Sequence, residues 1–145
     1  MKLPLAVITF AALIAFRDVA IAQDYKEGKI AYDQGDFARA LSIWKPLAEK
    51  GDPKAETGLG LMLELGVGVV PDFNEALKWY RLAAEKNEPY AQFNLGAIYA
   101  GGEKVKRDFA EAVKWLRLAA AQNHPDALFG LGSCYKHGLG VDQDI

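Results

Sequence analysis

Apolar and polar residues follow one another along most of the chain with the period of an α-helix. Apolar side chains recur every three or four residues, as expected when one face of a helix is buried against a neighbour. Two such stripes, from two different predicted helices, are Phe73, Ala76, Leu77, Tyr80 and Ala84, and Ala91, Leu95, Ile98 and Tyr99. The pattern therefore predicts a series of short amphipathic helices.

Short motifs mark where these helices begin and end. Asp72 and Asp108 each precede an apolar stripe and are followed three residues later by glutamate, which is the spacing of a helix capping box. Asn87 and then Pro89 follow the first of these stripes. Asn tolerates the left-handed conformation at a helix end, and Pro cannot continue a helix. We therefore expect the next helix at about 90–100.

The whole pattern repeats with a period of 36 residues. The segment 55–89 aligns on 91–125 without a gap, and shared runs include Leu-Gly, Asp-Phe, Lys-Trp and Arg-Leu-Ala-Ala. A third copy begins at Ala127, and half a unit precedes the first. A repeat of this length with two helices per unit predicts stacked helical hairpins. We place them at about 24–51, 55–87, 91–123 and, as an incomplete unit, 127–145.

The repeat gives most of the 14 glycines a place. Gly60, Gly96 and Gly132 fall at the same position inside a predicted helix, where alanine would favour the helix by about 1 kcal/mol. Their recurrence predicts a close approach by a neighbouring helix. The predicted loops contain Gly66, Gly68, Gly101, Gly102, Gly138 and Gly140.

Residues 1–22 have the order of a secretory signal peptide. A positively charged start precedes an apolar run over 3–16, and an Ala-Ile-Ala cleavage pattern ends at Ala22. The alternative is an uncleaved membrane anchor. A span needs about 20 apolar residues, and lengthening the run brings the Arg17-Asp18 pair into or near the lipid. We expect cleavage, a mature domain over 23–145, and no stable membrane span afterwards.

The composition excludes several classes of protein. The net charge is −2, without the basic excess typical of nucleic-acid-binding proteins, so we expect no nucleic-acid partner. The single cysteine, Cys134, excludes an intramolecular disulfide framework and a multi-cysteine zinc site. We expect neither a cofactor nor a metal.

Candidate catalytic and metal-ligating residues have simpler interpretations. Cys134 and His137 have the spacing of two ligands on one helix, but Cys134 occupies the repeat position of Met62 and Ile98. That position favours a small core side chain. His124 lies in a predicted turn, where we expect it to be solvated. The glutamates after the aspartate caps are explained by capping, and no catalytic residue is predicted.

The recurring residues resemble the Sel-one-like repeat, a relative of the tetratricopeptide repeat with a longer loop inside the hairpin. The resemblance covers about 55–145. Its matching residues in the central unit are Ala91, Leu95, Gly96, Tyr99, Gly102, Val105, Asp108, Ala112, Trp115, Ala119 and Ala120. Residues 25–54 are more similar to a plain tetratricopeptide hairpin.

This resemblance implies an all-α fold, namely a right-handed α-α superhelix or α-solenoid of helical hairpins. It also implies a non-enzymatic scaffold that binds a protein or peptide partner on a concave face lined by the first helices of the hairpins. Similar proteins occur in the bacterial envelope, so we expect an exported, periplasmic or secreted protein.

Partner-binding residues are expected on the first helices, at positions away from the repeated core stripe. Phe93 and Phe129 share one repeat position, and they either form an apolar track for a peptide or pack against the neighbouring hairpin. The full set of candidates is Lys54, Tyr90, Phe93, Asn94, Phe129, Ser133 and Lys136.

The last predicted unit lacks its second helix, because the expected cap, Asp144, is followed by one residue. Solenoid ends usually carry a polar cap. Three outcomes stay open for Leu128, Leu131 and Tyr135: another chain covers them, which includes self-association; the last helix frays; or the sequence is a truncated product.

Two other functions compete with an exported scaffold. A small cell-envelope enzyme would need a cleft with a perturbed acid or nucleophile. A membrane-tethered adaptor would retain the apolar run at 3–16 as its anchor.

Overall fold

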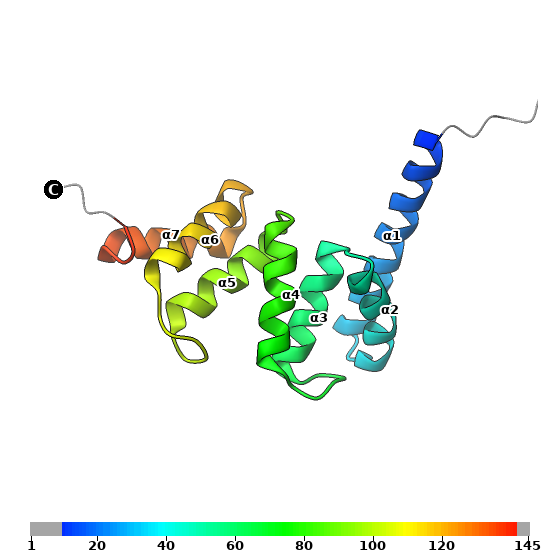
Figure 1. The fold of residues 1–145 in the computed structure, drawn as a ribbon, viewed down its shortest axis with the longest axis horizontal. Helices are drawn as coiled ribbons and strands as arrows, with labels where there is room; N and C mark the ends of the chain where they lie inside the picture. Colours follow the sequence, from blue (N-terminus) through cyan, green and yellow to red (C-terminus); the bar gives the residue numbers. More distant parts are fainter. Residues whose placement is uncertain (1–9, 142–145) are drawn as a thin grey trace, which may run out of the picture.

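The structure is a computed structural model that describes residues 10–141, and the regular secondary structure in that range consists of helices. Figure 1 shows the helices as a row of hairpins, with α1 at one end and α7 at the other. Consecutive helices pack against each other throughout. The predicted all-α superhelix is confirmed. The helices are α1 (Phe10–Asp33), α2 (Phe37–Glu49), α3 (Pro53–Leu65), α4 (Phe73–Glu85), α5 (Pro89–Gly101), α6 (Phe109–Ala121) and α7 (Pro125–His137).

The helix α1 extends much further back than the first predicted hairpin. It begins at Phe10, and Ile21 from its middle packs against the core formed with α2 and α3. Within residues 10–141, no helix combines the length and hydropathy needed to cross a bilayer. The start of the predicted leader and the predicted cap Asp144 lie outside the described residues.

An aspartate caps the N-terminus of each described second helix, α2, α4 and α6. Asp72 accepts a hydrogen bond from the Glu75 backbone N–H at 3.0 Å, and Asp108 accepts the equivalent bond from Glu111 at 3.0 Å. The reciprocal half of the capping box is replaced, because the Asp72 N–H donates to the Leu63 carbonyl instead. Glu75 and Glu111 each pair with a lysine three residues later. The aspartate caps are therefore confirmed, and the glutamates are surface ion-pair residues.

The helix ends use the left-handed backbone conformation. Asn87 has φ 68° and Asn123 has φ 62°, which confirms that asparagine ends α4 and α6. Gly66 ends α3 with φ 68°. Pro89 is the first residue of α5, a position that suits proline because its missing N–H would have no partner there.

Trp44 of α2 joins the first hairpin to the second. Its ring is 2% exposed, and its Nε1 donates to the Tyr25 carbonyl at 3.2 Å. A Cβ at Gly28 of α1 or Gly58 of α3 would overlap this ring. Glycine at these two positions therefore lets two helices from different hairpins enclose one indole.

The glycines at the shared repeat position behave as predicted in two hairpins and differently in α7. A Cβ at Gly60 would lie 2.8 Å from the Tyr80 ring, and one at Gly96 would lie 2.7 Å from Leu116. Both confirm a close approach by the second helix of the same hairpin. At Gly132, apart from the backbone of α7 itself and the two adjoining residues, no atom of the described residues lies within 4 Å of that place.

The two helices of a hairpin also meet through a buried polar pair that changes from one repeat to the next. Glu56 of α3 is 1% exposed and forms an ion pair with Lys86, which also donates to the Gly51 carbonyl at 3.1 Å. One repeat later, Gln122 donates to the Gln92 side chain at 2.9 Å. The Lys86 pair joins charged groups at the same positions where the Gln122 pair joins neutral amides.

We predict that alanine has opposite effects at the equivalent glycines. Gly60→Ala and Gly96→Ala force a Cβ against a packed side chain, and such overpacking costs about 1–3 kcal/mol, more than the gain of about 1 kcal/mol in helix propensity. Gly132→Ala meets open space and keeps that propensity gain. Urea unfolding monitored by circular dichroism should show lower free energies of unfolding for the first two variants. Equal effects at all three positions would contradict the close-approach argument.

We also predict that the two polar pairs are interchangeable as pairs. Lys86→Gln leaves the buried Glu56 carboxylate without a cation, and we expect a loss of about 2 kcal/mol because Lys86 itself is partly solvent-exposed. The double variant Glu56→Gln with Lys86→Gln reproduces the Gln92–Gln122 pair and should recover most of that loss. Thermal and urea unfolding measure both. A double variant as unstable as Lys86→Gln would refute this account.

Candidate partner-binding surface

The first helices α1, α5 and α7 present aromatic side chains that we call the aromatic row (Tyr25, Tyr90, Phe93 and Phe129). Tyr25 stacks on Trp44 with ring centroids 5.7 Å apart, and the Lys54 ammonium lies 5.8 Å from the Tyr25 centroid. Tyr90 is 62% exposed and Phe129 is 82% exposed. The row thus places aromatic side chains on the first helices of three hairpins, and those of Tyr90 and Phe129 are exposed to solvent.

The first helices α3, α5 and α7 begin at equivalent residues, each of which caps its helix. Glu88 accepts hydrogen bonds from the Ala91 backbone N–H at 2.8 Å and the Thr57 hydroxyl at 3.2 Å. One repeat later, His124 accepts the Ala127 N–H through Nδ1 at 3.4 Å. The capping group is therefore a carboxylate in α5 and an imidazole in α7.

The prediction that His124 is solvated is wrong. It is 5% exposed, stacks on Phe93 with centroids 4.9 Å apart, and meets the edge of Tyr90 at 4.6 Å. The hydrogen bond by which it caps α7 holds the imidazole in the turn. Two aromatic side chains of α5 cover the ring. His124 therefore belongs to the packed junction between α5 and α7.

The structure separates the two phenylalanines that share a repeat position. Phe93 packs against His124 of the next hairpin, whereas no described residue covers Phe129 in that way. Packing against the neighbouring hairpin therefore describes Phe93, and Phe129 offers a free apolar side chain.

The other predicted binding residues divide into two groups. Lys54, Ser133 and Lys136 are exposed, and the last two share one side of α7 with Phe129. Asn94 is half-buried beside the Tyr80 hydroxyl, whose pKa it lowers slightly. The structure therefore sets Asn94 apart from the exposed candidates, and the role of all seven in binding stays a prediction.

The half-buried Tyr25 and the buried Tyr80 both keep their protons at neutral pH. Burial, followed by the charges of Glu88 and Asp52, raises the pKa of Tyr25 to about 12. Burial and then the Glu64 carboxylate raise the pKa of Tyr80, whose hydroxyl donates to Glu64 at 2.8 Å. These hydroxyls are therefore neutral donors.

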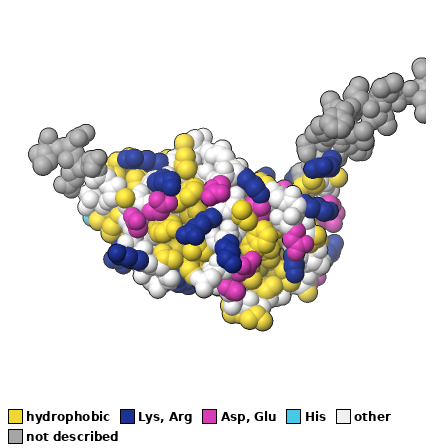
Figure 2. All heavy atoms as spheres, in the orientation of Figure 1, with side chains coloured by type: hydrophobic (Ala, Val, Ile, Leu, Met, Phe, Trp, Pro, Cys, Tyr) yellow, Lys and Arg dark blue, Asp and Glu magenta, His cyan; other side chains and the backbone are white. Residues whose placement is uncertain are grey.

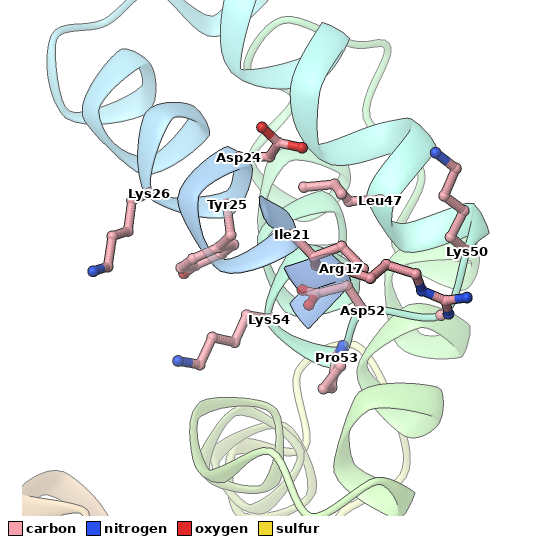
Figure 3. Close-up of a pocket in the computed structure, with 11 residues that line it drawn as sticks. Arg17, Ile21, Asp24, Tyr25, Lys26, Leu47, Lys50, Asp52, Pro53 and Lys54 are labelled. Atoms are coloured by element: carbon pink, nitrogen blue, oxygen red, sulfur yellow. The ribbon is translucent and has the colours of Figure 1, made fainter. Parts of the chain in front are cut away.

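A groove of about 850 Å³ adjoins the row at its N-terminal end. Ile21, Tyr25 and Leu47 line it with apolar surface (Figure 3). In the same view Lys26 and Lys54 extend to one side and Lys50 to the other. The rim also holds Arg17, Asp24 and Asp52, so positive side chains outnumber negative ones there.

The residues considered for chemistry are accounted for by structure. Cys134 is 5% exposed, and burial raises the pKa of its thiol, in agreement with the expected core position. The neighbouring His137 lies with Nδ1 2.9 Å from the Ser133 carbonyl. Within residues 10–141, no group of three or more His, Cys, Asp or Glu side chains is placed to share a metal ion.

Sequence reasoning missed Tyr25 and misjudged His124. His124 lies 36 residues after Glu88, the cap of α5. The repeat therefore indicates that His124 caps the next first helix, α7. Tyr25 belongs to the first hairpin, whose short turn takes it out of the 36-residue frame, so the repeat carried no signal for it.

Comparisons with known proteins agree with this repeat architecture. The family model of the Sel1 repeat matches residues 53–88, 89–124 and 125–145. Two of the similar solved structures are a Sel1 repeat protein from Oxalobacter formigenes and a protective antigen, with an SLR fold, present in uropathogenic Escherichia coli strains. No curated protein matches the chain.

The structural similarity is extensive over this chain and partial over the others. The Oxalobacter formigenes protein has 32% sequence identity and a TM-score of 0.76, over 86% of this chain and 37% of that one. The Escherichia coli antigen has 34% identity and a TM-score of 0.75, over 88% of this chain and 28% of that one. This chain therefore spans well under half the length of either protein. Because the family model covers most of the chain as three consecutive units, this protein belongs to the Sel1 repeat family.

Proposed function

We propose that this chain is an exported, non-enzymatic scaffold that binds an extended peptide segment of a partner protein along its first helices. Sel1 repeat proteins are generally protein-interaction scaffolds. The aromatic row is the observation that carries the finer proposal, because it presents Tyr90 and Phe129 to solvent at 62% and 82% exposure. Exposed aromatic side chains of this kind are enriched at protein interfaces and supply much of their binding energy.

The charges beside the row indicate the chemistry of the peptide. Lys54 lies at one end, next to Tyr25, and Lys136 lies on the same side of α7 as Phe129. On the face in view in Figure 2, hydrophobic patches lie between charges of both signs. A segment with apolar side chains for the row and acidic residues near its ends fits this surface best.

Export is supported by the order of the leader, with its apolar run and the cleavage pattern that ends at Ala22. Removal of residues 1–22 also removes Arg17 and Ile21 from the groove beside the aromatic row. The mature protein would then present a wider opening around Tyr25 and Leu47.

We predict that peptides selected on this protein depend on the aromatic row. A phage-displayed peptide library would be selected on the full chain, and the affinity of the recovered peptides measured by calorimetry. Tyr90→Ala and Phe129→Ala should each weaken binding about tenfold, because each removes a solvent-facing aromatic anchor. Leu118→Ala, on the second helix α6 and 42% exposed, is the matched control and should change nothing. Peptides that bind all variants equally would refute the proposed surface.

We predict that export removes the leader before Gln23. The full-length chain, produced in a Gram-negative host, would be isolated from the periplasm or the medium and its intact mass measured. A mass equal to residues 23–145 supports cleavage. An Ala22→Arg variant should slow processing, because signal peptidase requires a small residue at that position. Retention of residues 1–22 in the membrane fraction would instead support a tethered adaptor.

A further inference from the structure

Tyr90 of the aromatic row contacts the next first helix, whereas the residue at its position one repeat earlier contacts the previous one. The ring centroid of Tyr90 lies 4.6 Å from that of His124, which caps α7. Lys54, 36 residues before Tyr90, places its ammonium 5.8 Å from the centroid of the Tyr25 ring in α1. The repeat position alone therefore does not fix where this side chain lies.

The junctions between successive first helices also differ in chemistry. Between α3 and α5, the Thr57 hydroxyl donates to the Glu88 carboxylate at 3.2 Å. Between α5 and α7, the residues 36 positions later are Phe93 and His124, whose rings stack with centroids 4.9 Å apart. A polar contact in one junction is therefore replaced by an aromatic contact in the next, and Tyr90 lies beside the aromatic one.

The imidazole of His124 is fixed from two sides. Its Nδ1 accepts the Ala127 backbone N–H at 3.4 Å, which ties the ring to the first turn of α7. Phe93 of α5 stacks on the ring, with the two planes 16° apart. The residue is 5% exposed, and its buried Nε2 has no hydrogen-bond partner within the described residues. The cap and the stacking therefore hold the ring, which offers Tyr90 a rigid surface.

Tyr90 itself is much less enclosed. Its side chain is 62% exposed, and it meets His124 edge to face, with the ring planes 78° apart. Aromatic rings prefer this arrangement over a face-to-face sandwich. A side chain that is already held in one orientation loses less conformational entropy when a ligand binds. The contact with His124 therefore lowers the cost of binding a ligand at Tyr90.

We propose that His124 is a positioning residue for the peptide surface and acts by holding Tyr90 in the orientation that meets the peptide. This inference rests on the proposed function of the aromatic row. His124 is buried, so its effect on the peptide passes through Tyr90. Because His124 also caps α7, the helix that carries Phe129, it joins the two exposed aromatic side chains of the row into one surface.

The first experiment measures the orientation of Tyr90 in the free full chain by NMR. Side-chain coupling constants should show one χ1 rotamer in the unmodified protein. His124→Asn removes the ring and keeps a strong N-cap, and it should leave Tyr90 averaged over several rotamers. His137→Asn, the same change at the exposed histidine of α7, is the matched control and should leave Tyr90 unchanged.

Two results of this experiment overturn the proposal. One is a Tyr90 side chain that already averages over rotamers in the unmodified protein, a measurement that does not depend on the folding of any variant. The other is a single rotamer that persists in His124→Asn.

The second experiment separates positioning from a merely structural role. His124→Asn should weaken the selected peptides about fivefold, because Tyr90 must then be ordered on binding. In a Tyr90→Ala background the same change should have no further effect, whereas in a Phe129→Ala background the loss should persist. A loosened α7 would displace Phe129 and weaken binding in the Tyr90→Ala background as well, and that outcome overturns the proposal.

Failure of the proposed function gives a different result. Peptides whose affinity does not depend on Tyr90 refute the peptide surface, and the positioning role with it, while Tyr90 still shows one rotamer in the free protein. Peptides that depend on Tyr90 but bind His124→Asn as tightly as the unmodified chain leave the peptide surface intact and overturn the role of His124 alone.

Discussion

The architecture depends on close contacts between a large side chain of one helix and a glycine of the helix packed against it. Tyr80 against Gly60 and Leu116 against Gly96 bring the two helices of a hairpin together. Trp44, between Gly28 and Gly58, performs the same role across the first junction. Because protein interiors are close-packed, a missing Cβ on one helix and a ring or branched side chain on its neighbour together set the distance between helix axes.

The sequence predicted what depends on local spacing. The helices, their aspartate caps and their asparagine ends follow from short motifs within the 36-residue unit. The recurrence of that unit predicted the close contacts at Gly60 and Gly96 but also one at Gly132 that the described residues do not make. The predicted binding residues Lys54, Tyr90 and Phe129 are exposed on first helices, as a binding surface requires.

The remaining features depend on contacts between repeats. Whether Phe93 is covered and Phe129 is free depends on His124, which lies 31 residues after Phe93. A periodic pattern assigns equivalent positions the same environment, so it predicts the same packing for Phe93 and Phe129. The contacts of Tyr25 could not be predicted for a different reason. The turn of the first hairpin is shorter than the others, so Tyr25 has no equivalent in the 36-residue frame.

The change from a charged pair to an amide pair along the stack has a consequence for how the chain folds. Repeated elements of similar sequence can pair wrongly during folding, which is a characteristic error of repeat proteins. If α6, which ends at Gln122, packed on α3 in place of α4, Glu56 would be buried opposite an amide without a cation. Burying an unpaired carboxylate is strongly unfavourable. Glu56 and Lys86 therefore favour the pairing of α3 with α4 over that of α3 with α6.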